Sequence, residues 1–251
     1  MKQKSISAVK PLLALLFWTG IWYLAAVSLG KPLLLPTPYR VLRCLFGLMG
    51  TASFWQITAM TLLRILLGTL AAVVLGAVLA VMTSASSLVR ALVEPVMTVI
   101  QASPVASFAI LVLIWMDRDY VPALICAMMV LPVVWNNVST GIRQTDPQLL
   151  EMARVYRLPM RRVVLRVYIP SVRPYFRAAC SSGLGLGWKA GVAAEVLTVP
   201  RYSIGRMISD SKLYLMTEEL FAWTLAVVCL SLLLQKGMLL MLKGRDGHAE
   251  T

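Results

Sequence analysis

Lys189 and Glu195 are the residues whose chemistry most needs an explanation, because each is ionisable and lies inside an otherwise apolar stretch. A charged side chain in the hydrocarbon core of a membrane costs about 2.5–3.5 kcal/mol to insert, so it commonly lines a polar path or pairs with another helix. A separation of six residues corresponds to about 240° of helix rotation, which predicts that the two side chains point to different faces and do not pair. Three interpretations remain open for Lys189 and for Glu195: a place on a polar path, a position near the headgroups, or an ion pair with a neighbouring helix.

Uncharged polar residues in other apolar stretches are further candidates for such a path. Gln101 and Ser103 lie beside Pro104, which is expected to break or kink its helix, so their side chains are candidates to face a pore. Asn136 is a candidate as well, with a hydrogen bond between helices as the equal alternative. The candidate path residues are therefore Gln101, Ser103, Asn136, Lys189 and Glu195, of which Glu195 is the strongest and Lys189 the next.

The sequence contains no arrangement of residues typical of catalysis or metal binding. It has a single histidine, His248, and its cysteines are scattered without a CxxC pair, so they are interpreted as small core residues. It also lacks a G-x-x-x-x-G-K-[ST] run, the phosphate-binding loop of many ATPases. We therefore expect no catalytic residues, no metal site, no cofactor and no enzymatic activity in this chain.

The composition is that of a membrane protein. Hydrophobic residues make up 59% and charged residues 14% of the 251 residues, and the mean hydropathy is +0.78, whereas a soluble domain has about 45–50% and about 25%. Apolar runs of about 18 residues or more can cross about 30 Å of hydrocarbon as helices. Six such stretches are expected, at residues 11–30, 65–89, 95–116, 120–142, 178–200 and 220–242, the last two being interrupted by charged residues.

The distribution of positive charge predicts how the chain is oriented. Lysines before the first stretch are also typical of a secretory signal peptide, but the length of that stretch and the bulky Trp18, Trp22 and Tyr23 favour a retained membrane anchor. With the N-terminus inside the cell, the cytoplasmic side holds 15 Lys and Arg residues, counting Lys236 near the end of the last stretch, and the external loops hold 7. This excess predicts that both termini are cytoplasmic, and it explains the net charge of +13 without a nucleic-acid partner.

The longest polar segment, residues 141–177, has the pattern of two short amphipathic helices. Asp146-Pro147 is an N-cap followed by proline at the first helical position, and Leu158-Pro159 should end that helix. A second helix should then end at Pro170. The predicted apolar stripes are Leu149, Met152, Ala153 and Tyr156 in the first helix and Met160, Val163, Val164, Val167 and Tyr168 in the second. Two interpretations remain open: a basic hairpin lying on anionic lipid, or a docking element for another protein.

This segment resembles the EAA loop of ABC-importer permeases, which reads Glu-Ala-Ala, three free positions, Gly, nine free positions and then Ile-x-Leu-Pro. The residues that align with it, without a gap, are Glu151-Met152-Ala153 and Val167-Tyr168-Ile169-Pro170. Met152 replaces an alanine, and Arg157 stands where the family has a glycine for the turn between the helices. An arginine at positive φ costs roughly 1 kcal/mol, so Leu158-Pro159 is an alternative way to form that turn.

Other parts of the chain resemble the sulfonate/nitrate/taurine branch of these permeases. The similar segments are Leu35-Pro36-Thr37-Pro38, residues 188–195 and Tyr202-Ser203-Ile204-Gly205. The resemblance implies an all-α, polytopic membrane protein with about six transmembrane helices and a cytoplasmic coupling-helix hairpin. Residues 1–55 would then hold the N-terminal tail, first transmembrane helix and external loop, residues 56–243 the permease domain with its coupling loop at 141–177, and residues 244–251 the C-terminal tail.

The resemblance also implies site residues, partners and a location. The ATPase-coupling residues would be Glu151, Ala153, Arg154, Arg157 and Pro170. The chain would form a homodimer in the plasma or inner membrane, bind two copies of a separate ABC ATPase subunit, and receive solute from an extracellular or periplasmic binding protein. Its substrate would be a small anion such as a sulfonate, taurine or nitrate, or a vitamin precursor.

Two other classes of membrane protein compete with this interpretation. An ion-gradient-driven secondary transporter would use Lys189 and Glu195 as coupling groups, but such folds usually show two related halves, and the 178–200 pattern has no second copy. A membrane-embedded enzyme would need a clustered set of nucleophile, base or metal ligands, which the apolar stretches do not hold. The sequence therefore favours a permease subunit.

Overall fold

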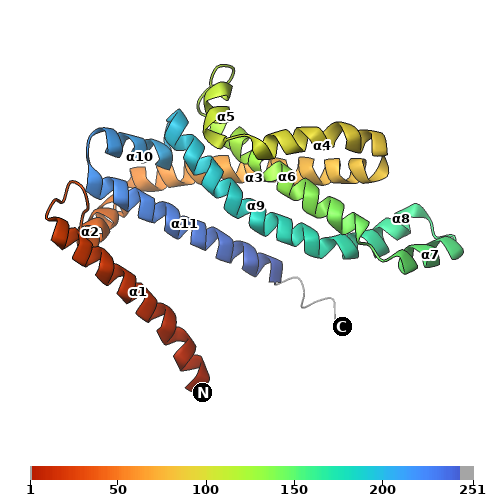
Figure 1. Cartoon of the computed structure of the whole chain (residues 1–251), viewed down its shortest axis with the longest axis horizontal. Coiled ribbons are helices and arrows are strands. Elements are labelled where there is room, and N and C mark those ends of the chain that lie inside the picture. Colours follow the sequence, from red (N-terminus) through yellow and green to blue (C-terminus); the bar gives the residue numbers. More distant parts are fainter. Residues whose placement is uncertain (1, 244–251) are drawn as a thin grey trace.

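The computed structural model describes residues 2–243, and every regular element in that range is a helix. Figure 1 shows them as an elongated bundle with a small hairpin, α7–α8, at one end and α2 and α10 at the other. The elements are α1 (Lys2–Leu29), α2 (Pro38–Met49), α3 (Ala52–Ala85), α4 (Ser87–Ala102), α5 (Val105–Val112), α6 (Val121–Arg143), α7 (Pro147–Val155), α8 (Met160–Val163), the π-helical turn η1 (Val164–Tyr168), α9 (Ile169–Thr198), α10 (Ile204–Leu213) and α11 (Thr217–Lys243).

The apolar helices confirm a polytopic helical membrane protein but not the exact number of six spans. Helices α3, α6 and α11 are long and apolar enough to cross a membrane, and α4 with α5 makes a fourth if the bent pair counts as one span. In α1 the apolar part of the described residues is the shorter stretch Leu13–Leu29. Helix α9 has 30 residues but carries Arg173, Arg177, Lys189 and Glu195, which lower its hydropathy.

The break between α4 and α5 confirms the expected effect of Pro104. The two helices are bent by 104° across Ser103 and Pro104. Proline has no backbone N–H, and it disfavours the α conformation in the residue before it, which here is Ser103 with φ −74° and ψ 128°. The short helix α5 therefore turns across the N-terminal end of α6 and the C-terminal end of α9 instead of extending α4.

Helix α6 lies at the centre of the bundle between α3 and α9. Its Cys126, Val130 and Val134 are fully buried against residues of both neighbours. Small residues allow this close approach: a Cβ atom added at Gly187 of α9 would lie 2.8 Å from the Cys126 sulfur, nearer than side chains pack. The central three helices therefore form a tightly packed unit on which the polar residues are placed.

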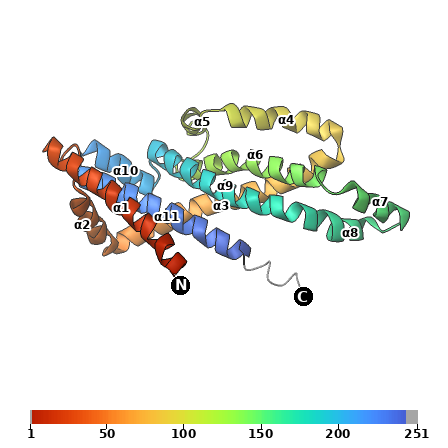
Figure 2. The same cartoon turned by 60° about the horizontal axis from the view of Figure 1, so that its bottom comes forward.

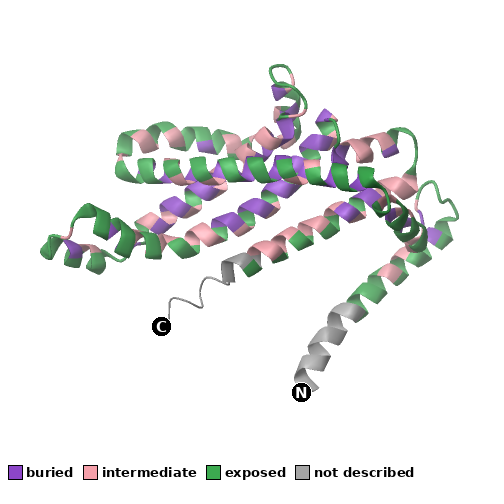
Figure 3. Cartoon of the chain, turned by 180° about the vertical axis from the view of Figure 1, so that it is seen from behind, coloured by how far each residue is buried: buried purple, intermediate pink, exposed green. Residues whose placement is uncertain are grey.

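Helix α1 stands apart from this unit. Figure 1 shows it diverging from α11 toward its N-terminal end, although the two helices overlap in the view of Figure 2. Near the C-terminal end of α1, the Trp22 ring stacks on Phe221 with centroids 5.9 Å apart. Figure 3 shows that its described part is largely exposed, and the exposed side chains are apolar, among them Leu16, Phe17 and Leu24. Within the single chain, this apolar surface has no protein covering.

Candidate functional site

The α7–α8 hairpin has the local structure that its sequence predicts at both turns. The Asp146 carboxylate accepts a hydrogen bond from the Gln148 backbone N–H at 2.8 Å, which caps α7. The helix ends before Leu158-Pro159, and the Leu158 N–H donates back to the Ala153 carbonyl at 2.9 Å. These bonds hold the hairpin in one shape.

Arg157 adopts the left-handed conformation expected of the glycine that it replaces. Its φ is +48°, in the region that non-glycine residues disfavour because Cβ crowds the backbone. The turn therefore keeps the geometry of the family pattern, and Leu158-Pro159 does not replace it with another.

Substituting Arg157 with glycine is expected to raise the free energy of unfolding by about 0.5–1 kcal/mol, because glycine adopts positive φ without the Cβ conflict. Thermal unfolding of the detergent-solubilised permease measures this change. Arg157→Ala is the matched control, since it removes the same side chain but keeps a Cβ. If alanine stabilises the protein as much as glycine does, the backbone argument is wrong.

The hairpin packs through only part of its two predicted apolar stripes. Ala153, Val163 and Val167 are buried as expected, and Leu150 packs against them. The other members of the first predicted stripe are exposed instead, with Leu149 40%, Met152 46% and Tyr156 73% accessible. In the second stripe, Met160 and Val164 are also exposed. Part of each stripe therefore packs within the hairpin, and the rest is exposed in the single chain.

Pro170 does not end the second helix, contrary to the prediction. Helix α8 continues through η1 into α9 without a break, and Pro170 lies in the first turn of α9. Proline has no N–H to donate to the preceding turn, and the backbone just before Pro170 adopts the wider π-helical form, in which the regular α-helical bonding is already interrupted. The hairpin is therefore joined directly to a 30-residue helix that continues to Thr198.

A second contact fixes the base of the hairpin against α6. The Tyr175 hydroxyl of α9 donates a hydrogen bond to the Gln144 side-chain oxygen, and the Tyr175 ring packs on Gly141, where an added Cβ would lie 2.9 Å from it. The hairpin connects the end of α6 to the start of α9, and these contacts hold the two helices together at that point.

The hairpin surface presents charged and apolar side chains together. Glu151, Arg154 and Arg157 are exposed, and within residues 2–243 Glu151 forms no hydrogen bond or ion pair. Val155 is 79% exposed and Tyr156 73%. Apolar side chains gathered among unpaired charges are typical of a surface that another molecule covers.

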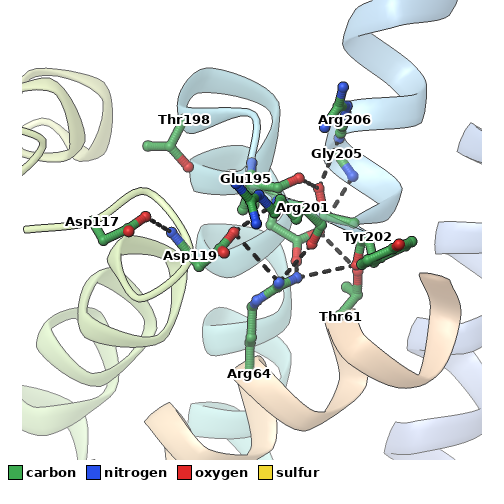
Figure 4. A network of polar contacts seen from close by, with 12 residues as sticks. Thr61, Arg64, Asp117, Asp119, Glu195, Thr198, Arg201, Tyr202, Gly205 and Arg206 are labelled. Atoms are coloured by element: carbon green, nitrogen blue, oxygen red, sulfur yellow. Dashed lines mark hydrogen bonds and ion pairs between the residues drawn. The ribbon is translucent and has the colours of Figure 1, made fainter. Parts of the chain in front are cut away.

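Glu195 lies at the other end of α9 in a buried polar cluster (Figure 4). Its side chain has no exposed surface. One carboxylate oxygen accepts hydrogen bonds from the Thr61 hydroxyl at 2.9 Å and the Gly205 N–H at 3.2 Å, and the other lies 3.5 Å from the Arg64 guanidinium. Glu195 therefore pairs with a neighbouring helix within the single chain, which is one of the three alternatives that its sequence position left open.

Arg64 joins three segments at this cluster. Its guanidinium donates to the carbonyl oxygens of Arg201 at 2.6 Å and Tyr202 at 3.2 Å, and it lies 3.7 Å from the Asp119 carboxylate. Asp119 in turn accepts a hydrogen bond from the Arg201 N–H at 2.7 Å. Tyr202 has a positive φ of 47°, a strained backbone that these contacts help to hold. The roles of Arg64 and Asp119 were not predicted from the sequence.

The remaining candidate path residues are not brought into this cluster. Gln101, Asn136 and Lys189 are exposed on the single chain, and the Ser103 hydroxyl donates to the Val99 carbonyl at 2.7 Å. The prediction that Lys189 and Glu195 do not pair is confirmed, since Glu195 is paired with Arg64 and Lys189 is exposed on another face of α9.

Comparison of the sequence with known proteins identifies the family of this chain. Residues 72–241 match the model of the binding-protein-dependent transport system inner membrane component. The chain is 26% identical over 223 residues to the taurine transport system permease protein TauC of Escherichia coli (strain K12), covering 86% of this chain and 81% of that protein. It is 25% identical to the putative aliphatic sulfonates transport permease protein SsuC of Bacillus subtilis (strain 168), covering 84% and 76%, and 30% identical to the nitrate import permease protein NrtB of Leptolyngbya laminosa, covering 58% and 52%. The chain is thus a transport permease subunit and belongs to the binding-protein-dependent transport system inner membrane components.

Proposed function

We propose that this chain forms the translocation path of an ATP-driven importer and couples to a separate ATPase through residues 146–170. A solute-binding protein on the outer side of the membrane delivers the substrate. The relatives named for taurine, aliphatic sulfonates and nitrate support a small anion as the solute. The family consists of transport permease subunits, so the chain itself is not an enzyme.

The observation that carries this proposal is the unbroken connection between the hairpin and α9. The hairpin has a capped first helix and a small packed core of its own, and it passes through η1 into a 30-residue helix. Displacing such a hairpin displaces α9 with it, whereas a loosely tethered loop would absorb the motion. An ATPase that changes shape while holding the hairpin would therefore move the membrane helices.

The coupling residues divide into a contact group and a shaping group. Glu151 and Arg154 are exposed, so they are available to an ATPase groove, where charge-assisted hydrogen bonds are strong. Ala153 is 3% exposed and packs the hairpin, Arg157 forms its turn, and Pro170 lies where η1 meets α9. A hairpin lying on anionic lipid would gain from the arginines but not from Glu151.

The ion-gradient alternative gains no support from the geometry. Its coupling groups were Lys189 and Glu195, and Glu195 is enclosed in an ion pair with Arg64. A proton or cation would have to break the whole cluster to reach that carboxylate.

A second copy of the chain and two ATPase subunits complete the proposed assembly. Gln101, Asn136 and Lys189 are exposed on helices expected to lie in the membrane, where lipid would not solvate them. A partner helix bundle would cover these polar residues, whereas lipid covers the exposed apolar residues of α1. In this arrangement the chain crosses the cell membrane several times, and both termini are cytoplasmic.

The mass of the solubilised complex should correspond to two permease chains and two ATPase chains. Native mass spectrometry of the complex purified through a tag on the ATPase measures the stoichiometry. Proteoliposomes containing that complex and the binding protein should accumulate solute only when ATP is supplied. A monomeric permease in a transporting complex, or uptake driven by an ion gradient without ATP, would contradict the proposal.

A further inference from the structure

Lys189 is a charge in a membrane helix with no partner in its own chain. Its side chain is exposed, and within the described residues its ammonium forms no hydrogen bond or ion pair. It lies nine residues before Thr198, the last residue of α9, or about 13 Å along the helix axis. That distance exceeds the reach of a lysine side chain, so Lys189 cannot escape to the external surface. Arg64, by contrast, is satisfied by four contacts within the chain.

The face that carries Lys189 is otherwise built of small or apolar residues. Ser182, Leu186 and Ala193 are exposed with it, and their spacing places them within about 60° of Lys189 around the helix. Glu195 lies on a different face and is already paired. No carboxylate of α9 therefore neutralises the ammonium, which leaves this face with a net positive charge.

The broken helix covers a different face of α9. Ala190 and Ala194 of α9 pack against Ala109 and Val112 of α5, the short helix that follows the break. These alanines are about 100° and 140° of helix rotation from Lys189, so α5 leaves the Lys189 face exposed. Ionisable side chains within membrane segments commonly face the interior of a helix bundle or a water-filled cavity. The exposed and unpartnered ammonium of Lys189 therefore indicates a hydrated space on its own face of α9.

We propose that Lys189 is the residue that attracts the anionic solute into the translocation path. This inference rests on the proposed function, because a second copy must enclose the space that Lys189 faces. An ammonium has three donors and no acceptor, so it favours anionic oxygens and repels cations. A dimer would place two such groups along one path.

Thiol labelling with charged reagents tests this assignment without knowledge of the substrate. The four native cysteines are replaced by alanine, and Ala193→Cys, one turn from Lys189, serves as the reporter; Ser182→Cys is a second reporter on the same face. The probes are two methanethiosulfonates, one bearing a sulfonate and one a trimethylammonium group. They are applied to membranes containing the full complex with its ATPase and binding protein.

The reporter should react faster with the anionic than with the cationic reagent when Lys189 is present. Lys189→Gln should lower the anion-to-cation ratio of rates about fivefold to tenfold, as expected for one unit charge at about 7 Å in water. Lys189→Arg should restore the ratio. Lys236→Gln is the matched control, since it removes an exposed lysine from another membrane helix, α11, and should leave the ratio unchanged.

Two results would overturn the inference. In the first, the ratio is the same with and without Lys189; in the second, neither reagent labels either reporter, which would place this face in a dry environment. Failure of the proposed function looks different, because the ATPase would then not copurify or uptake would not need ATP. The labelling ratio does not depend on either of those measurements.

Discussion

Replacing Glu151 with lysine is expected to abolish ATP-driven uptake while the protein still inserts into the membrane. Glu151 is exposed on α7 and has no partner among the described residues, so the substitution disturbs no contact within the chain. The hairpin already carries several arginines, and Glu151 supplies the negative charge that a basic group or backbone donor on the ATPase would meet. Reversing that charge places like charges against each other and should release the ATPase.

Copurification of the ATPase and uptake into proteoliposomes measure the two parts of this effect. Gln148→Lys is the matched control, because it adds a positive charge to the same helix at an exposed position three residues earlier. We expect that variant to retain most of its uptake. If Glu151→Lys keeps its ATPase bound and transports normally, the hairpin is not the docking element, and the lipid-surface interpretation replaces it.

Replacing Glu195 with alanine is expected to lower the free energy of unfolding by about 3–5 kcal/mol, the cost of removing one partner from a buried ion pair. The substitution leaves the Arg64 guanidinium buried without its carboxylate and removes the acceptor for the Thr61 hydroxyl and the Gly205 N–H. Thermal unfolding of the detergent-solubilised protein should show a large decrease in the transition temperature.

The exposed ion pair between Arg40 and Glu218 gives a matched comparison. Its charged atoms are 3.4 Å apart, close to the distance in the buried pair, but both side chains are about half exposed. Glu218→Ala should therefore cost about 0–1 kcal/mol, as exposed pairs do. The double variant Arg64→Met and Glu195→Leu should recover much of the loss by removing both charges. Equal effects of Glu195→Ala and Glu218→Ala would show that the cluster does not hold the fold.

Local signals in the sequence predicted the features that depend on neighbouring residues. Asp146-Pro147 predicted the start of α7, and Pro104 predicted the break after α4, because caps and prolines act on the adjacent backbone. Pro170 led to a wrong prediction, because it was expected to end a helix and instead lies in the first turn of α9. A proline near the start of a helix and a proline after its end look alike when the tertiary structure is unknown.

The polar cluster depends on contacts between distant segments, so the sequence could not specify it. Arg64 and Glu195 are 131 positions apart, and Asp119 comes from a third segment. The free-energy cost of inserting Glu195 into a membrane indicated that its charge must be stabilised there. An ion pair and a polar path both stabilise such a charge, and the sequence does not distinguish them. The same ambiguity was resolved differently for Lys189, which has no such neighbour.

The continuity of α9 also fixes the angular phase between its two ends. Each residue turns an α-helix by about 100° and advances it by about 1.5 Å. Adding or removing one residue between Pro170 and Glu195 would therefore swing the hairpin by about a quarter turn around the axis relative to the Arg64 cluster. An insertion of seven residues adds nearly two whole turns, so it would almost restore the direction of the hairpin. It would also lengthen the helix by about 10 Å. Relatives that retain both features should thus keep the spacing between them constant.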